Sequence, residues 1–108
     1  MPVDLTGLLD QIDAVLAQTP RSTKADLDDI ERTLTDGYAS AMALEAERWR
    51  VERKIAEVAR LIGNGDVANS AAELSDLSQM LATTDVELGA LRSRLAELRQ
   101  YAEAVRAH

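Results

Sequence analysis

Hydrophobic residues recur along most of this chain at alternating intervals of three and four positions, which places them on one side of an α-helix. The first run of this kind predicts a short helix over about residues 4–18. Thr19–Pro20 is expected to end that helix, because the residue before a proline is disfavoured in the helical conformation. Ser22 or Thr23 can then cap the start of a second helix.

From Leu27 the spacing becomes that of a coiled-coil seam, and it predicts a second helix over about residues 22–62. The Gly63–Asp66 run, with its strong turn chemistry, predicts an apex loop over residues 63–69. Ser70 and Glu73 have the spacing of a capping box and predict that a third helix covers about residues 70–107. The seam positions of the second helix are Leu27, Ile30, Leu34, Gly37, Ala41, Leu44, Arg48, Val51, Ile55, Val58 and Ile62. Those of the third are Leu74, Leu77, Leu81, Thr84, Leu88, Leu91, Leu95, Leu98, Ala102 and Val105.

The two seams match when the chain folds back at the apex, because opposed residues then have numbers that sum to about 132. Gly37 thereby meets Leu95, Ile62 meets Ser70, and each of the other seam positions meets a seam position of the other helix. The large polar residue of the first seam, Arg48, falls opposite Thr84, the polar interruption in the leucine run of the other. Each seam thus has a polar interruption, and the two interruptions fall opposite each other. Because the two helices have independent sequences, this coincidence supports the register.

The charge distribution favours an antiparallel pairing of the two long helices. Residues 22–46 carry a net charge of −4 and residues 91–108 carry +2, while residues 47–62 carry +2 and residues 63–90 carry −5. Antiparallel pairing sets each acidic segment beside a basic one, whereas parallel pairing would align the two acidic segments. Surface ion pairs are individually weak, but here their sum distinguishes the two orientations.

The predicted fold class is therefore all-α: a long antiparallel coiled-coil hairpin in a single domain, residues 1–108, with the short N-terminal helix packed at the open end. Gly37 leaves two alternatives for the second helix. The unbroken heptad phase favours one continuous helix, whereas Asp36–Gly37 also resembles a helix stop. The first helix is expected to reach only to about Tyr38, which leaves a bare two-helix arm beyond it.

The residue types present argue against an enzyme. The chain has no cysteine, and its one histidine, His108, is the last residue of the sequence. Thiol chemistry and thiolate metal sites are therefore excluded, and histidine-based acid–base catalysis is not expected. The glycine-rich apex lacks the lysine and the preceding strand of a phosphate-binding loop. We expect no catalytic residue, no metal site and no cofactor.

The net charge of −7 argues against nucleic acid and anionic membrane as partners, because both repel an acidic surface. Five basic residues lie between Arg48 and Arg60, but interleaved glutamates have the spacing of ordinary intrahelical pairs. No run of apolar residues is long enough for a membrane span, and no signal peptide is recognisable at the start. The sequence thus favours a cytoplasmic location.

Arg48 is the most informative polar residue, because a guanidinium on a seam must be paired or must reach water. The favoured interpretation is a polar layer with Thr84 and Asp85 that fixes the helix register. The alternatives are a hinge or ligand site where the hairpin opens, and an exposed side chain that extends to solvent.

A second stripe at spacings of four, three and four lies off the seam and contains Tyr38, Met42, Glu45 and Trp49. Aromatic and methionine side chains exposed on a bare arm typically mark a contact surface. Met80 on the third helix is expected to widen it. The alternative is that Trp49 lies flat against its own helix or against the first one.

We therefore expect a non-enzymatic protein–protein interaction module, an adaptor, scaffold or regulatory subunit, that forms a homodimer through the Trp49 surface and binds an unidentified protein. One alternative is an acidic inhibitor or chaperone that sequesters a basic partner such as a transcription factor. The other is a sensor that binds a small molecule at Arg48 and Thr84 or between two hairpins, although the sequence favours no small-molecule ligand.

Overall fold

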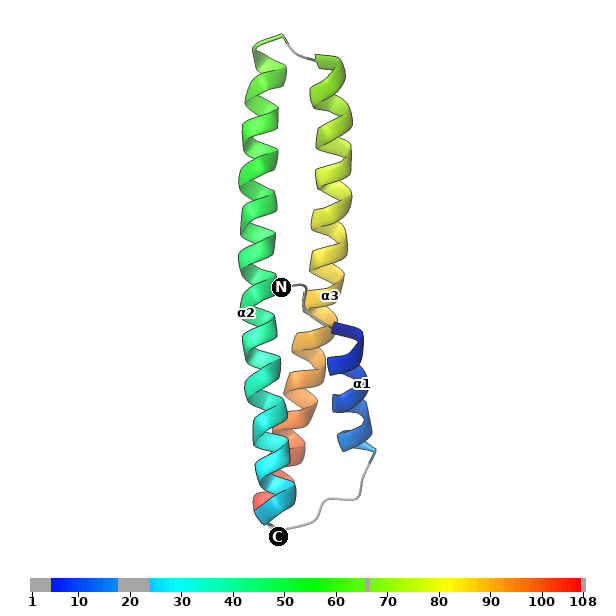
Figure 1. Ribbon diagram of the computed structural model, residues 1–108, viewed down its shortest axis with the longest axis vertical. Helices are drawn as coiled ribbons and strands as arrows, with labels where there is room; N and C mark the ends of the chain where they lie inside the picture. Colours follow the sequence, from blue (N-terminus) through cyan, green and yellow to red (C-terminus); the bar gives the residue numbers. More distant parts are fainter. Residues whose placement is uncertain (1–4, 18–23, 66, 108) are drawn as a thin grey trace. The chain divides into compact units, whose positions relative to one another are not determined.

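The computed structural model describes residues 5–17, 24–65 and 67–107. Three helices make up this part of the chain: α1 (Leu5–Leu16), α2 (Lys24–Gly63) and α3 (Val67–Ala107). The long helices α2 and α3 are antiparallel (Figure 1). The predicted all-α hairpin with a short N-terminal helix is therefore confirmed. The expected caps of α2, Ser22 and Thr23, and the expected stop at Thr19–Pro20 lie outside the described residues.

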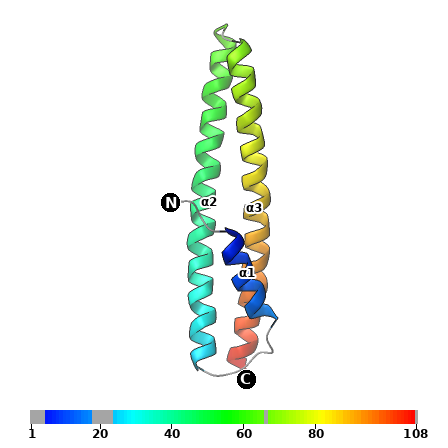
Figure 2. The same ribbon diagram turned by 45° about the vertical axis from the view of Figure 1, so that its right-hand side comes forward.

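Two compact units make up the chain. The three-helix unit comprises Met1–Ala43 and Gly89–His108, and the hairpin unit comprises Leu44–Leu88. In the three-helix unit, α1 lies beside the first half of α2 and the last half of α3 (Figures 1 and 2). The hairpin unit contains the second half of α2, the apex and the first half of α3.

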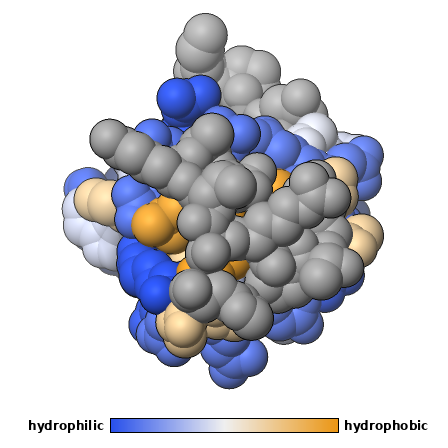
Figure 3. All heavy atoms as spheres, turned by 90° about the horizontal axis from the view of Figure 1, so that it is seen from below, coloured by the Kyte–Doolittle hydropathy of each residue, from blue (hydrophilic) through white to orange (hydrophobic). Residues whose placement is uncertain are grey.

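The core of the three-helix unit is made of the seam residues of α2 and α3 together with one side of α1. Its buried hydrophobic residues are Leu8, Ile12, Ile30, Leu34, Ala41, Leu91, Leu95, Leu98, Ala102 and Val105. Viewed from the end where α2 begins, the coloured residues are mostly hydrophilic, with small hydrophobic areas between them (Figure 3). The ten buried side chains form the hydrophobic core of this unit.

Polar contacts hold α1 against both long helices. Gln11 Nε2 donates a hydrogen bond to Thr33 Oγ1 at 3.2 Å, and the Thr33 hydroxyl donates to the carbonyl of Asp29 at 2.9 Å. Arg94 of α3 forms an ion pair with Asp13, with 2.8 Å between Nε and Oδ1. Thr33 is 2% exposed although it lies off the predicted seam, because α1 covers it. Ile12, which is completely buried, supplies the apolar part of this contact.

Helix α2 is continuous through Gly37, so the helix stop that Asp36–Gly37 suggested does not occur. The glycine lies directly against the side chain of Leu95 on α3. A Cβ atom built at Gly37 would overlap Leu95 Cδ2 and would lie 3.3 Å from Leu95 Cγ. This contact confirms the predicted pairing of Gly37 with Leu95.

The hairpin unit has a smaller core. Val51, Val58 and Leu77 form a buried cluster, and Ile55, Leu74 and Leu81 pack against it half-buried. These six residues are the members of three predicted pairs, so the register holds in this unit too. Leu44 and Leu88 are also buried, as is Ser70, which is 2% exposed.

The apex is shorter than the 63–69 loop predicted from the sequence. Helix α2 extends to Gly63, and α3 begins at Val67 rather than at Ser70. Ser70 is therefore a buried residue inside α3 and not its cap. Gly65 ends the turn with a φ of 101°, a left-handed conformation that favours glycine, and its amide donates to the Ile62 carbonyl at 3.1 Å.

Candidate functional site

Arg48 lies at the centre of an ion-pair group in the hairpin unit. Its Nε atom is 2.6 Å from Asp85 Oδ1 and 3.4 Å from Glu52 Oε1. Each of the three side chains is 47% exposed. Thr84, the residue that faces Arg48 in the predicted register, is buried at 8% exposure. The structure therefore brings Arg48 and Asp85 together, while Thr84 fills the seam beneath them.

The position of Arg48 has an electrostatic explanation. Glu52 and Asp85 occupy equivalent flanking positions on facing helices, where two carboxylates would repel each other across the seam. The Arg48 guanidinium extends from the seam to that flank, where its positive charge reduces the repulsion between the two carboxylates. Since all three groups remain half-exposed, water also screens them, and each pair contributes modestly to stability.

We predict that Arg48→Leu keeps or raises the thermal unfolding midpoint. A leucine would bury apolar surface against Thr84, and the half-exposed ion pairs that it removes are each worth only about 0–1 kcal/mol. Thermal denaturation followed by circular dichroism measures the change. Asp85→Asn is the matched control, since it breaks the same pair without adding apolar surface and should lower the midpoint slightly. A large fall for Arg48→Leu would show that the ion-pair group itself holds the hairpin together.

Trp49 is the largest exposed hydrophobic side chain of the hairpin unit, with 58% of its surface accessible. Its ring is covered on one face by the guanidinium of Arg53, whose Cζ lies 4.7 Å from the ring centroid. Such a cation–π contact is worth about 0.5–1 kcal/mol at an exposed site and orients the ring without burying it. The indole thus keeps most of its surface available for contact.

Tyr38 and Met42 belong to the three-helix unit. Tyr38 is 40% exposed and accepts a hydrogen bond from Arg99 Nε through its hydroxyl at 3.2 Å. The same guanidinium lies 6.0 Å from the centroid of the tyrosine ring. Tyr38 is thus partly engaged by α3 of its own chain. Met42 is 70% exposed and is the more accessible of the two side chains.

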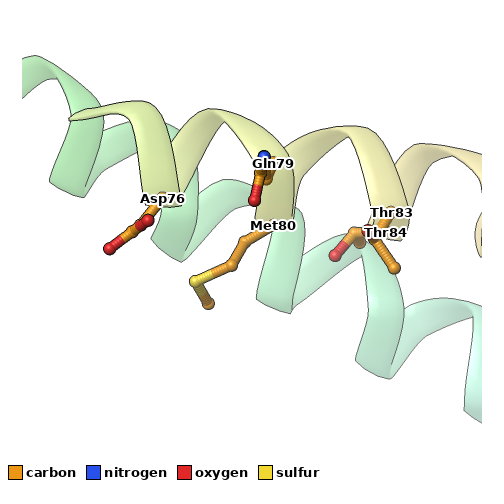
Figure 4. A pocket seen from close by; sticks show the side chains of 5 residues that line it. All are labelled: Asp76, Gln79, Met80, Thr83 and Thr84. Carbon is orange, nitrogen blue, oxygen red and sulfur yellow. The ribbon is translucent and has the colours of Figure 1, made fainter. Parts of the chain in front are cut away.

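Met80 lines a shallow hollow of about 450 Å³ on the surface of the hairpin unit. The other lining residues are Asp76, Gln79, Thr83 and Thr84. All five belong to α3, and Asp76 and Met80 extend away from the helix in the same direction (Figure 4). A small molecule there would be contacted from one helix only and would leave most of its surface in water, unlike ligands in typical binding pockets. Arg48 does not line this hollow.

Trp49 and Met80 lie on opposite flanks of the hairpin unit. One flank carries the Arg48–Asp85 ion pair. Trp49 lies on the same flank, because Glu52, the other partner of Arg48, follows it by three positions and residues three apart lie on the same side of a helix. The other flank is marked by Lys54 and Glu73, whose Nζ and Oε1 atoms are 4.0 Å apart. Met80 follows Glu73 by one heptad and lies on that second flank. The structure therefore does not join these two residues into one surface.

The flank that carries Trp49 is nearly free of charge beyond the Arg48 group, a feature not recognised from the sequence. We call this surface the Trp49 face. On α3 between Ala68 and Ala82 both charged residues, Glu73 and Asp76, belong to the opposite flank. The residues of the Trp49 face, all exposed, are Trp49, Ala56 and Ala59 of α2 and Ala68, Ala71, Ser75, Ser78 and Ala82 of α3. The signal that could have revealed it is the absence of charge on one side of α3.

A second hollow of about 320 Å³ lies between α1 and α3 in the three-helix unit. The Asp13–Arg94 ion pair belongs to its wall, together with Asp10 and the hydroxyl side chains Thr6 and Ser93. The cation in this wall is already bound by a carboxylate of α1. The hollow is thus a feature of how α1 docks on α3, and its wall carries the Asp10 carboxylate in addition to this ion pair.

Among the described residues no group of three or more histidine, cysteine, aspartate or glutamate side chains is arranged to hold a metal ion. In the same part of the chain no helix combines the length and the apolar character needed to cross a membrane.

The fold defines an all-α protein of the antiparallel helical-hairpin class with a short third helix. No protein-family profile, curated protein sequence or solved structure matches this chain.

Proposed function

We propose that the protein is a non-enzymatic interaction module that binds protein through the Trp49 face of its hairpin unit. One observation carries this proposal: a tryptophan that is 58% exposed stands at the edge of a helical surface almost free of charged residues. In a chain with 29% charged residues such a surface is unusual. Depletion of charge around an exposed aromatic residue is the composition that distinguishes the centre of protein interfaces from ordinary surface.

The thin core of the hairpin unit supports the same proposal. Two packed helices bury one narrow stripe each, and among the described residues of this unit five hydrophobic side chains are buried: Leu44, Val51, Val58, Leu77 and Leu88. Large hydrophobic side chains remain exposed there, namely Trp49, Leu61, Val67, Met80 and Val86. Docking of another helical surface would add apolar burial that the unit cannot supply by itself.

We predict that Trp49→Ala weakens association about tenfold or more while leaving the helix content nearly unchanged, because tryptophan side chains at the centre of interfaces commonly contribute this much. Association is measured by analytical ultracentrifugation of the protein alone and by titration with any protein it captures. Leu61→Ala is the matched control, since Leu61 is 47% exposed and lies on the opposite flank. If Trp49→Ala leaves every association unchanged, the face is not an interface. If it unfolds the chain, Trp49 supports the monomer instead.

A further inference from the structure

We infer that the occupant of the Trp49 face is a second copy of this chain, related by a two-fold axis parallel to the helices, so that α2 of each copy packs on α3 of the other. This inference rests on the proposed function and specifies its partner and geometry. Two hairpins joined in this way form a four-helix bundle with both apices at the same end.

The register of the hairpin leads to this geometry. A two-fold axis parallel to the helices leaves the height of every residue along that axis unchanged. Residue pairs that are level within one chain, with numbers that sum to about 132, are therefore also level between the chains. Trp49 thus comes opposite residue 83 of the second copy, and the nearest member of the Trp49 face on α3 is Ala82.

The side chains at these levels are complementary in size. Trp49 would meet Ala82 of the second copy, and Ala56 would meet Ser75, with number sums of 131 in both cases. A bulky residue of α2 is therefore set against a small residue of α3, as interdigitating helix surfaces require. The two-fold axis repeats each contact, so one tryptophan per chain provides two anchors per dimer.

Charge supports a second copy as well. Positions 68–82 of α3 present only alanine and serine to this flank, so two copies can approach without placing like charges directly opposite each other along that stretch. On α3, the acidic residues Glu73 and Asp76 lie on the other flank. On the flank of Trp49, the carboxylates of Glu52 and Asp85 both pair with Arg48 of the same chain, which offsets part of their negative charge.

The size of the face sets the expected strength of the dimer. It extends over fifteen residues of α3, from Ala68 to Ala82, which is about 21 Å at a rise of 1.5 Å between successive residues. Two helices of this length present roughly 400 Å² per copy, which is about half the area of a standard specific interface and falls in the range of weak, transient ones. The dimer is therefore expected to be weak and to form at micromolar concentrations of the chain.

Cysteine cross-linking tests this register cleanly, because the native chain contains no cysteine. The Ala56→Cys and Ser75→Cys variants are mixed at high micromolar concentration under mild oxidation and separated without reductant. We expect the disulfide between the two different variants to exceed both self-disulfides several-fold. Glu57→Cys mixed with Asp76→Cys is the control, since these exposed residues lie on the opposite flank and should cross-link only at the level of random collision.

A pair of adjacent substitutions tests the face without disulfides. Ala82→Glu introduces a charge at the expected Trp49 contact and should weaken the dimer at least tenfold. Thr83→Glu introduces the same charge at the next residue of the chain, which lies on the opposite flank, and should leave the dimer unchanged. Both side chains are exposed, so circular dichroism should show the same helix content in both variants.

The outcomes separate this inference from the proposed function. A dimer whose self-disulfides predominate would overturn the two-fold axis along the helices and place α2 on α2. A chain that stays monomeric at high micromolar concentration would overturn the second copy as occupant, while Trp49-dependent binding of another protein would leave the proposed function standing. Loss of dimer in both Ala82→Glu and Thr83→Glu would overturn the assignment to this flank.

Discussion

Leu98→Ala is expected to lower the free energy of unfolding by about 2–5 kcal/mol, the largest effect of any single substitution considered for this protein. Leu98 has no accessible surface and lies in the core of the three-helix unit. Removing three carbons there loses their transfer free energy and leaves a cavity that the packed helices cannot fully close. Urea denaturation followed by circular dichroism measures the change as a shift of the midpoint.

The matched control for this prediction makes the same chemical change on the surface. Leu61→Ala removes an identical set of atoms at a side chain that is 47% exposed, and it should cost a small fraction of that amount. Equal losses of unfolding free energy in Leu61→Ala and Leu98→Ala would contradict the burial of Leu98 in the structure.

Gly37→Leu is expected to lower the stability by about 1–3 kcal/mol, even though leucine is the better helix former by nearly 1 kcal/mol. The reason is the absence of space, because a Cβ at this position already overlaps Leu95 Cδ2. Leu95 is 3% exposed and has little room to move aside. The unfolding midpoint in urea again provides the measurement.

A double substitution distinguishes crowding from any other cause of this loss. In a Leu95→Ala background the added leucine has space to fill, so Gly37→Leu should become less harmful or stabilising, and the two changes should not be additive. Gly89→Ala is the control within α3, since no atom lies within 4 Å of a Cβ there and the gain in helix propensity should raise the stability by up to about 1 kcal/mol. A loss at Gly37 that persists without Leu95 would rule out the steric explanation.

The sequence predicted the hairpin and its register because both are determined by the periodicity of apolar residues, which repeats along two long helices and can be compared between them. The contact of Gly37 with Leu95 shows that this comparison located an opposed pair correctly. The prediction for the apex was less accurate. Ser70 and Glu73 matched a capping box, but the same spacing recurs within helices, and Ser70 is in fact a buried residue of α3 three positions after its start at Val67.

The candidate site was less predictable, since it depends on which flank of the seam each side chain occupies. The sequence predicted that Met80 widens the Trp49 surface, because the two residues lie at similar heights along the hairpin. The ion pairs of Arg48 and Lys54 show instead that they lie on different flanks. The burial of Thr33 likewise follows from the docking of α1, a tertiary contact that the heptad pattern of α2 does not contain.

The unequal cores of the two units have a consequence for the dynamics of the chain. Local unfolding is easiest where few apolar contacts oppose it, so backbone amides of the hairpin unit should exchange their hydrogens with solvent sooner than those of the three-helix unit. The Trp49 face therefore lies on the unit that we expect to open more readily of the two. Any protein that binds only the closed hairpin must suppress that opening, and it would thereby protect this segment from proteolysis in proportion to its occupancy.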